Sequence, residues 1–384
     1  MYIRNGAIMS LNKIIYLDNA ATTPLCDSVK KYIIDMLDNY GNPSSLHQTG
    51  RQAKEILDTS RETIANFIHA SAENIYFTSG GSANNTLAIR GYLLKNCCKP
   101  IYLPIAHKSI TKCLQSMDVS ETYKLKVSRN GMIKIDDLEN KLSRQPDLQP
   151  FVIIEYANSE IGTVQDVQKI IDLTHSYRGI VYLDCVGSIS TIPLNVQELD
   201  VDLCGFSAHK IGGLKGCGVL YKKNSINLRP LIYGSQEQGL FGGTENVIGI
   251  GAMGKAVESI DYKTMDSKNR DYVLNYIENN IANCYLIGSK KHRLIHNLYI
   301  CFQGIEGEAL STLLDQYGIQ VSTGSACNSG EKIPSSTLLN IGMDKEDLHS
   351  CIRMTFSGTE TKDELDYVCM ALARCVNMLR LLKK

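Results

Sequence analysis

The stretch Ser207-Ala208-His209-Lys210-Ile211-Gly212-Gly213 sets a lysine behind a serine and a histidine and in front of two glycines. Upstream, residues 179–184 read Gly-Ile-Val-Tyr-Leu-Asp, an apolar run typical of a buried strand that ends in a carboxylate, Asp184. A lysine can form a Schiff base with an aldehyde, and a hydroxyl and an imidazole beside it can bind a phosphate. The stretch therefore indicates a site for a phosphorylated aldehyde.

Asp184 and Lys210 together have a specific chemical use. A carboxylate can keep a pyridine nitrogen protonated, and the protonated ring of pyridoxal 5'-phosphate (PLP) is an electron sink. We therefore expect a PLP site built on these two residues. The alternative is a surface lysine in a glycine-rich turn, which the Ser-x-His-Lys pattern alone does not exclude.

Alternating strands and helices surround this stretch. We expect strands over residues 74–77, 100–104, 122–127, 151–156, 180–184, 201–206 and 218–221. Nearly continuous apolar strands separated by helices, one of which is expected over residues 135–142, predict an α/β fold with a mainly parallel, doubly wound sheet. Ligands bind such sheets where loops leave the carboxyl ends of strands. Ser82, His107, Asn158 and Asp184 all stand at or just after such ends.

A second anion site is predicted at Thr78-Ser79-Gly80-Gly81-Ser82, between the strand over residues 74–77 and a helix. The free backbone N–H groups and the dipole of a helix N-terminus favour a phosphate. An ordinary strand-to-helix turn is the alternative. The lysine stretch elsewhere in the same sheet favours the phosphate.

After Tyr221 the sequence changes character. A glycine-rich loop, residues 234–246, precedes a helix over residues 247–260. We expect a polar helix over residues 261–281 and a strand over residues 297–302 next, followed by further short strands and helices. We expect a large PLP-binding domain over residues 14–260. Residues 1–13 and 261–384 would form a smaller α+β domain.

The loop over residues 321–330 of this smaller domain is small, polar and glycine-rich. Its Cys327 has no large apolar neighbours in sequence, so it is the best candidate for a reactive thiol. An incidental loop cysteine is the alternative.

Composition excludes several classes of protein. The chain has 384 residues, is 43% hydrophobic and has a formal net charge of zero, so we expect no generic nucleic-acid or acidic-membrane binder. No apolar run is long enough to predict a membrane helix, and residues 1–11 do not resemble a signal peptide. Thirteen scattered cysteines without a Cys-x-x-Cys pair suit a reducing cytoplasm better than disulfides or a metal site.

Five motifs, in this order, resemble those of the cysteine desulfurases, which are fold-type I PLP enzymes of the class V aminotransferase group. They are Leu17-Asp18-Asn19-Ala20-Ala21-Thr22-Thr23, Gly41-Asn42-Pro43-Ser44-Ser45, Asn158-Ser159-Glu160-Ile161-Gly162, Ser207-Ala208-His209-Lys210 and Gly324-Ser325-Ala326-Cys327. The resemblance extends from Ile14 to Leu382. The Cys327 loop resembles that of the subgroup that supplies sulfur for iron–sulfur clusters and thiolated RNA.

The resemblance implies a catalytic role for three residues. Lys210 would hold PLP as a Schiff base and later move the substrate's Cα proton. His107 would stack on the PLP ring and act as acid and base. Cys327 would attack the substrate sulfur. Asp184 would pair with the ring nitrogen.

The resemblance also implies binding roles. Gly81, Ser82, Ser207 and His209 would hold the phosphate, with Thr244 reaching in from the partner subunit of a homodimer. Asn158 is expected at both the cofactor and the substrate carboxylate, which it would share with Arg353. A planar guanidinium suits a bidentate contact with a carboxylate.

The activity so implied is removal of sulfur from L-cysteine, which gives L-alanine and a persulfide on Cys327. A sulfur-acceptor or scaffold protein in the cytoplasm would take the sulfur. One alternative is a selenocysteine lyase or another class V PLP enzyme, against which Cys327 argues. The other is a weakly active PLP-bound scaffold for sulfur-accepting partners, which would need neither Lys210, Arg353 nor Cys327.

Three positions near the expected site depart from the family pattern. Ala83 stands where the pattern has glutamate, Gly187 where it has glutamine, and Phe241 where it has arginine. The usual glutamine bonds the cofactor's phenolic oxygen. These departures bear on rate, cofactor tuning and substrate preference.

Overall fold

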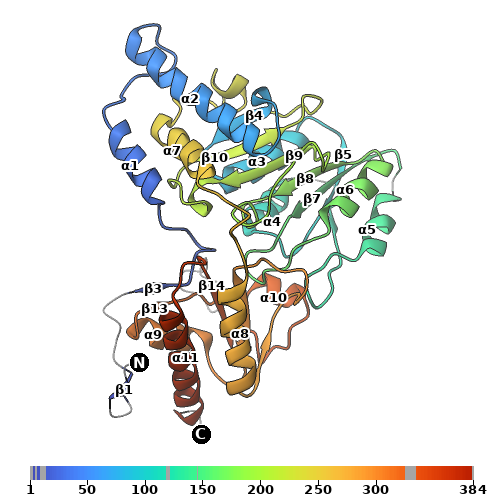
Figure 1. Ribbon diagram of the computed structural model, residues 1–384. Coiled ribbons are helices and arrows are strands. Elements are labelled where there is room, and N and C mark those ends of the chain that lie inside the picture. Colours follow the sequence, from blue (N-terminus) through green and yellow to red (C-terminus); the bar gives the residue numbers. More distant parts are fainter. Residues whose placement is uncertain are drawn as a thin grey trace.

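The computed structural model describes residues 3–4, 7–8, 14–117, 122–144, 146–324 and 334–382. Its main sheet has seven strands in the order β4-β10-β9-β8-β7-β5-β6 (Figure 1). In that order the bounds are Ile75–Thr78, Gly218–Lys222, Leu203–Ser207, Ile180–Asp184, Gln149–Glu155, Cys98–Tyr102 and Tyr123–Lys124. β10 runs antiparallel to β4 and β9, and the other pairs are parallel. The expected α/β fold with a mainly parallel sheet is confirmed.

Seven helices accompany this sheet. They are α1 (Asp27–Met36), α2 (Gln48–Phe67), α3 (Gly81–Leu93), α4 (Lys108–Gln115), α5 (Ile135–Leu142), α6 (Val167–Ser176) and α7 (Val247–Glu258). α3 packs on β8, β9 and β10, α6 packs on β8, and α2 lies along α7. The central strands are mainly apolar, and every residue of β8, β9 and β10 except the half-buried Ile180 is buried, as expected for a sheet covered by helices on both faces.

The smaller domain lies below the main sheet in Figure 1. It contains an antiparallel sheet in the order β11-β12-β14, with bounds Cys284–Leu286, Asn297–Phe302 and Cys351–Thr355. Its helices are α8 (Lys268–Asn280), α9 (Gly307–Gln316), α10 (Ser336–Asn340) and α11 (Lys362–Leu382). A separate short hairpin joins β1 (Ile3–Arg4) and β2 (Ala7–Ile8). None of the described helices is both long and apolar enough to cross a membrane.

β3 (Ile15–Tyr16) lies just after the expected domain boundary at residue 14. β3 pairs in parallel with β13 (Ile319–Gln320), and Ile15 and Leu17 pack in an apolar core together with residues of the smaller domain. These contacts connect the start of the expected large domain to the smaller domain, and the boundary itself stays a prediction. The pairing partner lies some three hundred residues further along the chain, so local periodicity could not reveal it.

Two elements are shorter than expected. The helix predicted from residue 261 begins only at Lys268, because Asp261 forms a turn in which its Oδ1 and its backbone carbonyl accept bonds from Lys263 and Thr264. The strand predicted over residues 122–127 is reduced to Tyr123–Lys124 at the edge of the sheet.

Candidate active site

Asp184 and Lys210 lie at the same edge of the main sheet. Asp184 ends β8 and pairs in register with Gly205 of the parallel neighbour β9. β9 ends two residues later, at Ser207, and the 3-10 turn Ala208–Lys210 follows at once. The carboxyl ends of two adjacent parallel strands thus bring the carboxylate and the lysine together, as the sequence predicts.

The Asp184 side chain is buried and held on both oxygens. Its Oδ1 accepts a bond from the backbone N–H of Val186 and its Oδ2 one from Asn85 Nδ2, each at 2.9 Å. Burial raises the pKa of Asp184, although these donors, His107 and Lys210 all act to lower it. A buried carboxylate in this position gains from a further cation, and a protonated pyridine nitrogen is one.

The loop after β3 holds the Lys210 segment. Lys210 Nζ donates to the carbonyl oxygens of Ala20 and, at 2.9 Å, Ala21. Thr23 donates from its N–H and its hydroxyl to the carbonyl of His209, at 3.0 and 2.9 Å. This loop is the first of the five motifs, and these bonds explain its place beside the lysine.

His107 caps the N-terminus of α4. Its Nδ1 accepts from the backbone N–H of Ser109 at 3.2 Å and lies 2.7 Å from the Ser109 hydroxyl. The His107 side chain is exposed, yet desolvation by the protein packed around it lowers its pKa, and Lys210 lowers it further against the opposing effect of Asp184. The imidazole is therefore neutral near pH 7 and able to take up a proton.

Glu155 is a site residue that the sequence analysis missed. It ends β7 beside Asp184, and its two oxygens accept from the backbone N–H of His107 at 2.8 Å and from Asn158 Nδ2 at 3.1 Å. Burial and the charge of Asp184 raise its pKa well above the usual value. A carboxylate at the end of an otherwise apolar strand is the signal that could have revealed it.

Asn158 follows the same strand, and protein partners fill its hydrogen-bonding positions. Its Nδ2 donates to Ile105 O at 2.7 Å and to Glu155, and its Oδ1 accepts from the N–H groups of Glu160 and Ile161 at 3.1 and 3.0 Å. A neutral amide has two donor hydrogens and two acceptor lone pairs. Asn158 therefore ties loops together, and its contact with a ligand stays a prediction.

The predicted phosphate site surrounds the N-terminus of α3. Gly80 has a φ of 136°, a conformation that favours glycine, and Ser207 is buried close to it. A Cβ on Gly218 would lie only 2.6 Å from the Gly80 Cα, so the two backbones require glycine to approach. Gly81 and Ser82 are the first two residues of a helix of 13 residues.

His209 and Thr244 are placed differently. His209 Nδ1 lies 3.3 Å from the Thr22 hydroxyl, and burial together with Lys210 and Lys215 lowers its pKa to about 4. Thr244 is exposed at the end of the glycine-rich loop. An exposed position is compatible with its predicted contact across a homodimer.

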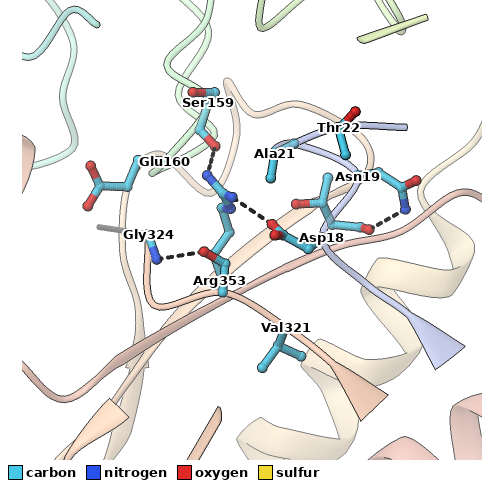
Figure 2. Close-up of polar contacts among 12 residues, drawn as sticks. Asp18, Asn19, Ala21, Thr22, Ser159, Glu160, Val321, Gly324 and Arg353 are labelled. Atoms are coloured by element: carbon cyan, nitrogen blue, oxygen red, sulfur yellow. Dashed lines mark hydrogen bonds and ion pairs between the residues drawn. The ribbon is translucent and has the colours of Figure 1, made fainter. Parts of the chain in front are cut away.

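Arg353 comes from β14 of the smaller domain and is buried between two partners (Figure 2). Its Nη2 forms an ion pair with Asp18 Oδ1 at 2.7 Å, and its Nη1 donates to the carbonyl of Ser159 at 3.2 Å. A small cavity beside Lys210 has Ser159 and His296 in its wall. Ser159, which accepts the bond from Arg353, thus connects the predicted substrate arginine to the cavity of the predicted lysine.

The three positions that depart from the family pattern take no part in the hydrogen bonds described above, and the predicted nucleophile Cys327 lies outside the described residues. Ala83 is half-buried on α3, and Phe241 is half-buried against the main core. Gly187 lies on the wall of the Lys210 cavity, where a Cβ would come within 2.8 Å of the Ala157 carbonyl oxygen. The Ala157 carbonyl therefore occupies space that a glutamine side chain at position 187 would need.

These residues fit PLP. A buried carboxylate, a lysine just after the next strand and a glycine-lined helix N-terminus match the ring nitrogen, the aldehyde and the phosphate in chemical type. Residues 15–368 match the protein-family model aminotransferase class-V. The chain belongs to the class-V aminotransferase family.

Individual members of the class-V family are similar over nearly the whole chain. A protein of Dictyoglomus turgidum named cysteine desulfurase IscS is 38% identical, with 95% of each chain covered. A solved structure named NifS-like protein has a TM-score of 0.86 at 30% identity and covers 95% of this chain and 100% of its own. A structure titled SspA in complex with cysteine has a TM-score of 0.79 at 27% identity, covering 90% and 100%.

Proposed function

We propose that this class-V protein is a PLP-dependent cysteine desulfurase that converts L-cysteine into L-alanine and carries the sulfur as a persulfide on Cys327. The observation that carries the proposal is the placement of Asp184 and Lys210 at the ends of adjacent parallel strands, with His107 beside them. Relatives named cysteine desulfurase support the choice of substrate.

The overall reaction balances without an external oxidant or reductant. The substrate C–S bond breaks, and an S–S bond forms between the substrate sulfur and the sulfur of Cys327. The substrate carbon is reduced to a methyl group while the Cys327 thiol is oxidised to a persulfide. The products are one alanine and one protein persulfide for each cysteine.

Bound PLP supplies the electron sink that stabilises negative charge at the substrate Cα. Asp184 would hold the proton of the pyridine nitrogen. Lys210 would hold the cofactor and then move the proton at Cα. His107 would exchange protons through Nε2, because its Nδ1 is engaged by Ser109.

The binding residues complete the proposal. Arg353 would bind the substrate carboxylate, and Asn158 would hold the loop beneath it. The phosphate would lie at the α3 N-terminus, with Gly81, Ser82, Ser207 and His209 around it, and Thr244 would reach the phosphate of the partner subunit.

We further propose a cytoplasmic homodimer that passes the Cys327 sulfur to acceptor proteins for iron–sulfur clusters or RNA thiolation. Four large apolar side chains near the α1–α2 connection support an interface between subunits because they are exposed to solvent: Ile34, Leu37, Tyr40 and Leu46. Their burial in a second copy would remove them from water.

The test is a product balance with the purified, PLP-loaded protein. L-cysteine should yield L-alanine and a persulfide on Cys327 in equal amounts in a single turnover. L-selenocysteine as the only productive substrate would instead favour a lyase. Retention of PLP without alanine or persulfide would contradict the proposed desulfurase.

A further inference from the structure

Two nitrogen atoms in the smaller domain are buried without a hydrogen-bond partner among the described residues: His296 Nδ1 and Arg353 Nε. His296 immediately precedes β12, and Arg353 lies in β14, which pairs with β12. The backbone N–H of Phe356, just after β14, donates to the His296 carbonyl at 2.9 Å. An unpaired buried polar atom costs free energy, so its position calls for a ligand or another explanation.

His296 lines the same cavity as Lys210. Two other polar side chains of its wall are already engaged by the protein. Asn297 accepts from Arg293 at 2.9 Å and donates to Ser159 O and Glu160 O, each at 3.3 Å. Asn19 Nδ2 donates to the Thr355 carbonyl at 2.8 Å. His296 thus lines this wall and carries a buried Nδ1 that has no hydrogen-bond partner among the described residues.

The protein already engages two of the three guanidinium nitrogens of Arg353. Asp18 already holds Nη2 and the Ser159 carbonyl holds Nη1, so Nε is the nitrogen left without a partner (Figure 2). Asn158, the other predicted carboxylate contact, has its four amide positions filled. A carboxylate that binds beside Arg353 can therefore accept a hydrogen bond from Nε–H, and a second donor would hold its other oxygen.

The charges around His296 suit an anion. Burial, together with the positive charges of Arg270 and Arg353, lowers the pKa of the His296 imidazole to about 4. The Arg270 charge is partly offset by its ion pair with Asp271 at 2.6 Å. The imidazole is therefore neutral near pH 7, and a neutral imidazole with its proton on Nδ1 donates one hydrogen bond there.

We propose that His296 is a substrate-binding residue whose Nδ1–H donates a hydrogen bond to the α-carboxylate of the amino-acid substrate, alongside Arg353 Nε. The inference rests on the proposed function, because it takes the substrate to be an α-amino acid whose amine would replace the Lys210 amine on the cofactor. It assigns His296 a role in specificity: the donor selects α-amino acids over amines that lack the carboxylate.

The test compares two ligands that differ only in that carboxylate, L-alanine and ethylamine. Each is titrated against the PLP-loaded enzyme, and the visible absorbance change on amine binding gives the dissociation constant. His296→Leu removes the donor, and His296→Asn keeps a donor, Nδ2, near the place of Nδ1. His292→Leu is the matched control, because His292 lies in the same segment and is exposed.

His296→Leu should weaken L-alanine binding roughly tenfold, the value of one hydrogen bond to a charged group, and leave ethylamine binding unchanged. His296→Asn should recover most of the loss, and His292→Leu should match the wild type. An equal loss for both ligands, no loss for L-alanine, or a wild type that does not prefer L-alanine would overturn the inference. Persulfide formation, measured separately, reports on the proposed function whichever result is found.

Discussion

The two halves of the candidate site are built in opposite ways. On the main sheet, Asp184 and Glu155 each have both carboxylate oxygens bonded to protein donors, and Asn158 has its amide positions filled. In the smaller domain, His296 Nδ1 and Arg353 Nε are buried without a partner in the described part of the chain. In the sheet half, the two carboxylates and the amide have their hydrogen bonds filled by the protein before a ligand arrives. In the other half, two nitrogen atoms are left for a ligand to bond.

This difference has a physical reason. Groups that stabilise charge during a reaction must already be held in place, because reorientation during the reaction would cost free energy. Groups that recognise a substrate gain affinity from the hydrogen bonds that only the substrate supplies. The sheet half therefore suits the chemistry, and the smaller domain suits selection of the substrate.

Replacing Lys210 breaks the sheet half, and the largest effect is expected there. Lys210→Ala should reduce alanine production by about a thousandfold or more, because the variant loses both the amine that holds PLP and the base at Cα. Borohydride reduction followed by peptide mapping should find the pyridoxyl group on Lys210 of the wild type. The exposed Lys215→Ala is the control; a pyridoxyl group on any other lysine would contradict the assignment.

Cys327→Ser separates the sulfur step from the sheet half. The variant should keep PLP and still show the absorbance change with L-cysteine, yet form no persulfide, because a hydroxyl is a poor nucleophile toward sulfur. Persulfide labelling checks this. Cys351→Ser is the control. A hydrogen bond with the free thiol of Cys301, together with burial, raises the pKa of Cys351, so this thiol is not expected to react. Wild-type labelling of Cys327→Ser would move the role to another thiol.

Gly187 lies on the cavity between the two halves, and the family pattern has glutamine there. A Cβ would approach the Ala157 carbonyl to 2.8 Å, so Gly187→Gln should lower the free energy of unfolding by about 1–3 kcal/mol and should not speed turnover. Gly187→Ala adds the same Cβ and should show most of the loss. Urea denaturation and initial rates measure both; a stable, faster Gly187→Gln would show that the close approach is relaxed at no cost.

The smallest effect concerns pH and His296. Its folded-state pKa of about 4 lies below the usual histidine value, so the folded protein binds fewer protons than the unfolded one between these values. The wild type should therefore lose stability as pH falls below about 6.5, by up to about 1.4 kcal/mol per pH unit from this group. His296→Leu should fall less steeply in urea denaturation at about pH 7, 6 and 5. Parallel curves for wild type and variant would contradict a buried neutral His296.

The sequence predicted the sheet half well because its signals are local. The signals are an apolar strand that ends in Asp184 and the glycines around Lys210, and each can be recognised within a few residues of sequence. The helix over residues 135–142 and the strand over residues 297–302 were predicted with the bounds that the structure has. Each depends on periodicity that neighbouring residues carry.

The other half could not be predicted in the same way. His296 has no local motif, and its role depends on packing beside Arg353, which lies 57 residues further along the chain. The ion pair that engages Arg353 comes from Asp18, at sequence separation 335. Asn158 looked like a ligand contact in sequence, and only the structure shows four protein partners around its amide.

The pairing of β3 with β13 also affects how the chain can fold during synthesis. Ile319 emerges from the ribosome 304 residues after Ile15, its partner in the ladder. At about 5–20 residues per second, that delay is roughly 15–60 s. During this time Ile15 and Leu17 lack the core that later buries them, while the strands of the main sheet already have partners. The smaller domain is therefore the last to close, and the nascent chain must keep β3 from aggregating until then.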